Sequence, residues 1–124
     1  MPGLLEMRAG FVHEATVELA AGADQRAPGA AVTVALCGSW EHDGACAVPH
    51  CTVVDRRAAQ SLQVRVVFAC VPTDEAGVRR RIVAALAAGT LVGPDGSSEW
   101  RLVGPRPDRL RAYEEAQSDR WRAP

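Results

Sequence analysis

The sequence predicts a single α+β domain, a two-layer sandwich in which a mostly antiparallel sheet of about five strands packs against one main helix. Three observations support this fold class: several runs that alternate apolar and polar residues, one clear amphipathic helix, and connections too short for crossovers. The prediction covers residues 1–124 as one domain, with an irregular loop at 39–50 and a C-terminal tail or short helix at 105–124. The nearest common arrangement is a ferredoxin-like variant.

The first half of the chain is predicted to hold two paired strands. Residues 11–20 alternate between apolar and acidic or polar side chains, which predicts a half-buried strand. A helix over residues 4–20 is the alternative, and the pattern leaves it open. Residues 21–30 contain two glycines and a proline, which predicts a loop. Residues 31–37 alternate again and predict a second strand, paired antiparallel with the first.

Three further strands are predicted at residues 50–55, 62–71 and 98–103, the second of which is the longest. Its alternation places Arg65 on an outward, solvated face. Val67 and Ala69 add apolar surface to that face, so we expect a homodimer that pairs through the sheet.

One helix is predicted over residues 73–88. Thr73 is the expected N-cap, acidic residues follow it in the first turn, and Gly89 suits the position after the last turn. The last residues, 108–121, predict a short amphipathic helix with Leu110, Tyr113, Gln117 and Trp121 on its apolar side.

Composition excludes several classes of protein. Apolar residues make up 48% of the chain and charged residues 23%, as in folded globular proteins, and the absence of lysine is typical of a GC-rich, actinobacterial genome. A net charge of −1 gives no electrostatic basis for binding nucleic acid. No run of apolar residues is long enough to span a membrane, and the start lacks the pattern of a signal peptide, so we expect a cytoplasmic protein.

Thiols and imidazoles concentrate between Cys37 and Cys51. Because thiolate and imidazole are the preferred ligands of zinc, this cluster predicts a Zn²⁺ site. The expected ligands are His42, Cys46 and His50, with Cys51 or His13 as a fourth.

Trp40 and Asp43 are expected to line a pocket beside these ligands. We expect Trp40, His42, Cys46 and His50 to converge on one cavity at the end of the sheet. Two alternatives stay open: the loop is purely structural, or a histidine activates Cys46 as a reactive thiol. His13 lies on an apolar strand face, where a histidine is more often a core residue than a ligand.

The sequence therefore predicts a small metal-binding protein that takes a small-molecule ligand, with a lyase, cyclase or hydrolase activity if one metal position is open. The alternative is a non-catalytic module that binds a ligand or a protein partner. A run of arginines at 79–81 points in three helical directions, and two of them together with Arg56 and Arg57 could bind a phosphate or carboxylate, although a solvated helix face is the default interpretation.

Overall fold

The computed structural model describes residues 7–37, 48–93, 96–108 and 111–121. These residues form an α+β fold with one curled, antiparallel sheet of five strands and three α-helices. In chain order the elements are β1 (Ala9–Leu19), α2 (Ala27–Cys37), β2 (His50–Arg56), β3 (Ser61–Cys70), the 3₁₀ helix η1 (Pro72–Asp74), α3 (Glu75–Ala88), β4 (Thr90–Gly93), β5 (Gly96–Asp108) and α4 (Ala112–Arg120).

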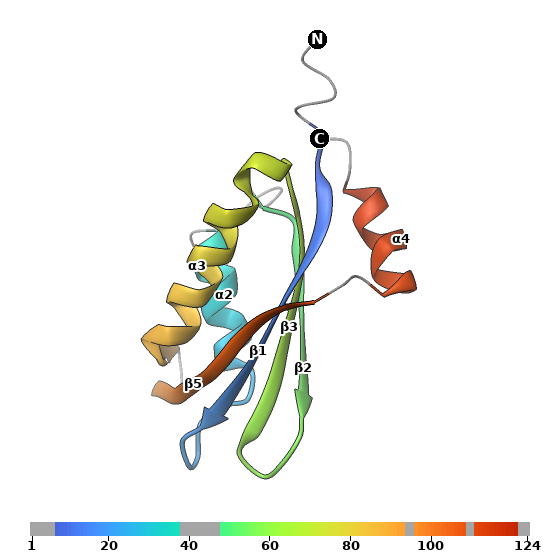
Figure 1. The fold of residues 1–124 in the computed structure, drawn as a ribbon. Helices are drawn as coiled ribbons and strands as arrows, with labels where there is room; N and C mark the ends of the chain where they lie inside the picture. Colours follow the sequence, from blue (N-terminus) through green and yellow to red (C-terminus); the bar gives the residue numbers. More distant parts are fainter. Residues whose placement is uncertain (1–6, 38–47, 94–95, 109–110, 122–124) are drawn as a thin grey trace.

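The order of strands across the sheet is β2-β3-β1-β5-β4, so β1 lies at the centre. It pairs antiparallel with β3 on one side and with β5 on the other. Figure 1 shows α2 and α3 side by side on one face of the sheet and α4 on the opposite face. The starts of β1 and β2 and the end of β3 meet at one end of the sheet, where α3 also begins.

The main hydrophobic core lies between the sheet and the helices α2 and α3. Alternate residues of β3 point into this core, and Phe68 among them is fully buried. A stripe on α3 with a spacing of four residues (Val78, Ile82 and Leu86) packs against them. Trp100 of β5 closes the far end of the core, and its indole nitrogen donates a hydrogen bond to the carbonyl of Leu86 at 2.8 Å.

Several predicted elements are confirmed. The first strand exists and the alternative helix does not extend through it, because β1 pairs along its length with two neighbours. The strands β2 and β3 and the helix α3 agree with the predicted ranges to within two residues. Gly89 ends α3 with φ of 71°, and a Cβ there would lie 2.6 Å from the carbonyl oxygen of Trp100, so glycine is required on both counts. Thr73 is not the N-cap of α3, since it lies within η1 and Asp74 precedes the first helical residue.

The predicted strand at residues 31–37 is wrong, because these residues belong to α2. The alternation of Val32, Val34 and Leu36 also contains an i, i+4 pair, and this pair, Val32 and Leu36, is buried in the core. Pro28 is the second residue of the helix, where proline is tolerated since the first turn has no internal partner for its N–H. The proline therefore begins a helix here and does not break one.

The predicted total of about five strands agrees with the structure, but only because two errors compensate. The strand at residues 31–37 is absent, and the short strand β4, which was not predicted, pairs with the start of β5. The last strand is also longer than predicted and continues through Pro105 and Pro107 to Asp108. Proline is acceptable there because β4 pairs only with residues up to Glu99, so this part of β5 is an edge.

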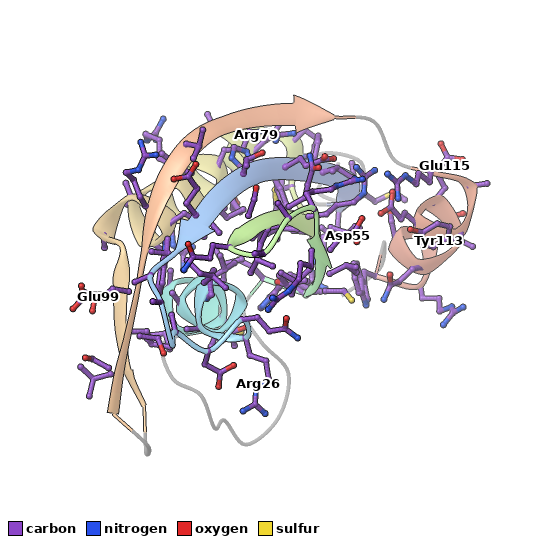
Figure 2. The ribbon with its side chains drawn as sticks, turned by 90° about the horizontal axis from the view of Figure 1, so that it is seen from below. Arg26, Asp55, Arg79, Glu99, Tyr113 and Glu115 are labelled. Atoms are coloured by element: carbon purple, nitrogen blue, oxygen red, sulfur yellow. The ribbon has the colours of Figure 1, made fainter. Side chains whose placement is uncertain are left out.

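The predicted C-terminal helix is confirmed as α4, but its buried side differs from the prediction. Glu114 and Ser118 are buried, while Tyr113 is 62% exposed and projects from α4 (Figure 2). Val67 and Ala69, on the sheet face that we expected to mediate a homodimer, are themselves buried in the single chain. Because α4 contacts β1 and β3 on this side, the sheet has helices on both faces.

Candidate functional site

A cavity of about 760 Å³ lies at the end of the sheet where α3 begins. Its lining comes from the residue before β1 (Arg8), from Val48 two residues before β2, and from the last residue of β3 and the next residue (Cys70 and Val71). The rest of the lining comes from η1 and from the first part of α3, between Thr73 and Ala84. We call this cavity the α3 groove. It exceeds two other cavities, of about 560 and 220 Å³, that adjoin α4 and β2 respectively.

The helical repeat of α3 separates the residues of the groove from those of the core. Residues 73, 77, 80, 81 and 84 recur at intervals of three or four and line the groove, whereas Val78 faces both the core and the groove floor. Gly77 lies in the middle of this side. A Cβ at Gly77 would meet only the guanidinium end of Arg80, at 3.6 Å, so the missing side chain leaves open space.

Three arginines line the groove, and their hydrogen bonds differ. Arg81 donates to the carbonyls of Ala35 and Leu36 at 2.7 and 3.3 Å, which fixes its guanidinium against the last turn of α2. Arg8 and Arg80 have no carboxylate partner in the part of the chain that the structure describes. Asp74 is the only acidic residue among the described residues of the lining, so positive charge predominates there.

Cys70 is the one thiol among the described residues that line the groove. Burial, followed by the nearby carboxylates of Asp74 and Glu75, raises the pKa of this thiol to about 11. At neutral pH it is therefore protonated and a poor nucleophile. Together with Val48, Val71 and Val78, it gives the groove an apolar wall.

Arg79, beside the two groove arginines in sequence, points toward the sheet. Its Nε donates to Glu75 at 2.7 Å, and its Nη1 donates to the carbonyl of Val12 at 2.7 Å. Its guanidinium also lies over the ring of Phe68, 5.4 Å from the ring centroid. The arginine run therefore divides into one structural residue and two that line the groove.

His13 is a buried core residue, as its position on an apolar strand face favoured. Nη1 of Arg79 lies 3.3 Å from Nδ1 of His13. Since arginine can only donate, Nδ1 is the acceptor and the proton resides on Nε2, which is buried and has no hydrogen-bond partner among the described atoms. A protonated Nε2 has no lone pair for a metal, so this arrangement does not favour His13 as a ligand.

Stability should fall as His13 becomes protonated. Burial, and to a lesser degree the charge of Arg79, lowers the pKa of His13 below its ordinary value of 6.5. The unfolded chain therefore binds this proton more readily than the folded chain. We expect the contribution of His13 to the free energy of unfolding to be constant above about pH 7 and to decrease as the pH falls through about 6.5.

Urea denaturation from pH 7.5 to 5.5 measures this effect, with His13→Gln as the comparison. Glutamine offers Arg79 an acceptor but does not titrate, so the variant should lose most of the slope in this range. Glu114 does not interfere, because the hydrogen bonds from Arg65 lower its pKa below the ordinary 4.5 and its effect begins at lower pH. An equal slope in both proteins would contradict the assignment.

The structure separates two of the predicted zinc ligands. His50 pairs with Phe68 of β3 and points to the helix side, where its Nε2 lies 3.2 Å from the hydroxyl of Thr33 and its Nδ1 lies 2.9 Å from the carbonyl oxygen of Val48. Cys51 is the next residue in the strand and therefore points to the opposite face. These opposite directions do not favour binding of one ion by both side chains. His13 lies on the same face of the sheet as His50, the face covered by α2 and α3, but β3 lies between their two strands.

The other predicted site residues, Trp40, His42, Asp43 and Cys46, lie outside the described residues. Within residues 7–37, 48–93, 96–108 and 111–121, no group of three histidine, cysteine or acidic side chains is placed to hold a metal ion. Cys37 is disulfide-bonded, whereas Cys51 and Cys70 are free. The sulfur of Cys37 also lies 3.9 Å from Nδ1 of His50.

A buried ionic cluster that sequence reasoning missed holds α4 on the sheet. Arg65 donates to both carboxylate oxygens of Glu114 at 2.7 Å and to Glu14 at 2.6 Å. Gln63 donates to the other oxygen of Glu14, and the backbone N–H of Arg111 donates to Glu114. All three charged side chains are at most 6% exposed, so the prediction of a solvated outer face is wrong around Glu14 and Arg65.

No protein-family model, curated protein or solved structure matches this chain. None of the helices in the described ranges has the length and apolar character needed to cross a membrane.

Proposed function

We propose that this protein is a non-catalytic domain that binds a small molecule in the α3 groove. The observation that carries the proposal is the pairing of cavity size with unpaired charge: about 760 Å³ of space faces two guanidinium groups, those of Arg8 and Arg80, without carboxylate partners in the described chain. Sites for small organic ligands usually occupy about 300–1,000 Å³ and combine apolar walls with a few polar groups. The groove has both.

Binding is favoured over catalysis by the chemistry of the lining. The Cys70 thiol, with a pKa of about 11, lacks the thiolate character that a nucleophile needs. Among the described residues of the lining, the side chains that carry oxygen are those of Thr73 and Asp74. Neither of them makes a hydrogen bond to a histidine. A general base paired with a nucleophile, which covalent catalysis requires, is therefore not assembled by these residues.

We further propose that the fold is a ferredoxin-like variant with an added β4 hairpin. The order β2-β3-β1-β5 and the placement of α2 after β1 and α3 after β3 support this assignment. In the predicted two-layer arrangement, α2 and α3 would form the second layer, and α4 is then an addition on the other face. The groove lies at the end of the layer formed by the helices.

Zinc binding is a second proposal. It is supported by His50, whose Nδ1–H donates to the Val48 carbonyl at the edge of the predicted loop and so leaves Nε2 as the ligand nitrogen. Nε2 lies 3.2 Å from the Thr33 hydroxyl and would exchange that contact for the ion. His42 and Cys46 would be its other ligands, and the direction of Cys51 in β2 does not favour a site shared with His50. A homodimer likewise stays a proposal, with an interface elsewhere than on the surface of Val67 and Ala69, which is buried.

A thermal-shift screen with a small set of acidic, neutral and basic fragments tests the proposed function. Gly77→Leu should fill the groove without moving the backbone, since only the flexible end of Arg80 lies within 4 Å of the new Cβ. We expect fragments that stabilise the wild type to have no effect on this variant. Ala87→Leu is the matched control, because Ala87 is exposed on the same helix but does not line the groove.

Equal responses of Gly77→Leu and the wild type would overturn the proposal that the groove is the binding site. Elemental analysis of the same preparations addresses the second proposal. Zinc binding predicts about one ion per chain, whereas less than about 0.2 ion per chain under conditions that preserve labile metals would exclude it.

A further inference from the structure

We infer that the ligand of the α3 groove is a small organic dianion, such as a phosphate monoester or a dicarboxylate. This inference rests on the proposed function and adds the chemical class of the ligand. Three arginines and one aspartate among the described residues of the lining leave an excess of two positive charges. A ligand with two negative charges would neutralise that excess, whereas a neutral ligand would leave the guanidinium groups without counter-charges.

The three guanidinium groups come from two parts of the lining, the residue before β1 and the helix α3, which favours binding of an anion between them. Arg8 precedes β1, whose first residue Ala9 pairs with Cys70 on the groove wall. Arg80 and Arg81 come from α3. Arg81 is already held in place by two carbonyls of α2, so it would lose little conformational freedom when a ligand binds.

Guanidinium groups suit this class of ligand because their planar N–H pairs match the oxygen spacing of phosphate and carboxylate groups. The interpretation does not depend on the helix dipole at the start of α3, since Asp74 and Glu75 already occupy that end. The preference for an anion comes from the guanidinium groups of Arg8 and Arg80, which have no carboxylate partner among the described residues. Elsewhere on the surface, Arg26, Arg57 and Arg101 each have an acidic partner within 4 Å.

The size and walls of the groove indicate an organic molecule and not a free inorganic ion. Inorganic phosphate would fill only a small part of about 760 Å³. Val48, Val71 and Val78 offer apolar surface for the body of a ligand, away from the arginines. A compound with an apolar ring and a dianionic head should therefore bind more tightly than the head alone.

A matched series of probes tests the charge requirement by calorimetry at constant ionic strength. Phenyl phosphate and phthalate are dianions, benzenesulfonate is a monoanion, and phenol is neutral, while the ring is common to all. We expect at least one dianion to bind about tenfold or more tightly than benzenesulfonate and phenol, because a charge-assisted hydrogen bond contributes about 1.5–3 kcal/mol. The tighter of the two dianions identifies the head group.

Arg80→Gln should weaken binding of the favoured dianion about tenfold and change binding of phenol less than about twofold. Arg80→Lys should retain part of the affinity, because the charge remains but the planar N–H pair is lost. Arg101→Gln, on β5 and outside the groove, removes the same charge from the protein and should have no effect on any probe. Arg80 is exposed, so these variants should keep the wild-type melting temperature.

Two results would overturn the inference, and they are distinguishable. If phenol binds as tightly as either dianion and Gly77→Leu still abolishes its binding, the groove is a binding site but not one for anions. If no probe binds the wild type, or if Gly77→Leu binds all probes as the wild type does, the proposed function fails together with the inference.

Discussion

Replacing Arg65 by alanine is expected to lower the free energy of unfolding by about 3–5 kcal/mol, because it leaves two buried carboxylates without a counter-charge. Both Glu14 and Glu114 depend on this guanidinium, which is 6% exposed. Urea denaturation at pH 7 measures the loss. Arg101→Ala is the matched control: its ion pair with Glu18 is exposed, so the expected cost is at most about 1 kcal/mol.

The same cluster can also be replaced as a whole. Because buried ion pairs contribute little more than apolar residues of similar volume, a triple variant with Arg65→Met, Glu14→Leu and Glu114→Leu should regain most of the stability that Arg65→Ala loses. A loss of less than about 1 kcal/mol in Arg65→Ala would mean that the carboxylates are solvated, and that the ionic cluster does not hold α4 on the sheet.

Phe68→Ala is expected to destabilise the protein by about 3–5 kcal/mol, the cost of a large cavity in a packed core. The Phe68 ring is fully buried, its centroid lies 5.6 Å from that of Phe11, and Arg79 lies over its face. Tyr113→Ala removes an aromatic ring that is 62% exposed and should cost less than about 1 kcal/mol. Equal losses in the two variants, measured by the same denaturation method, would contradict the described core.

The elements that sequence predicts well are those with a single consistent period. The alternation in β1 and β3 and the four-residue spacing of Val78, Ile82 and Leu86 in α3 each fit one kind of structure. In α2 the evidence conflicts: Val32, Val34 and Leu36 fit a strand, and Pro28 and Gly29 suggest a loop before it. The helix is decided by burial of Val32 and Leu36 under the sheet, which is a tertiary effect.

The ionic cluster under α4 could not be predicted from local pattern. Glu14 and Arg65 occupy polar positions in alternating strands, and such positions are usually solvated. They are buried because α4, more than 45 residues farther along the chain than Arg65, places Glu114 over them. The one available signal was Arg65 itself, since a charged residue within a long apolar strand often marks a buried pair.

The candidate site shows a similar limit. The sequence drew attention to the thiols and imidazoles at 39–50, but of these only His50 lies among the described residues, and it faces α2. The arginines that line the groove are instead Arg8, Arg80 and Arg81. The elements β1, α2, β2 and β3 lie between Arg8 and the other two in the sequence. The arginine run was recognised as a candidate for phosphate or carboxylate, but Arg56 and Arg57 lie away from it, on and just after the end of β2.

Chemical-shift mapping by two-dimensional ¹H–¹⁵N NMR, during titration with phenyl phosphate, tests the central claim most directly. The α3 groove predicts saturable shifts at Arg8, at Cys70–Val71 and through η1 and α3 from Thr73 to Ala84, which should be absent in Gly77→Leu and retained in Ala87→Leu. Saturable shifts confined to β2 and the residues around α4, with no change along α3, would contradict the assignment of the groove as the binding site.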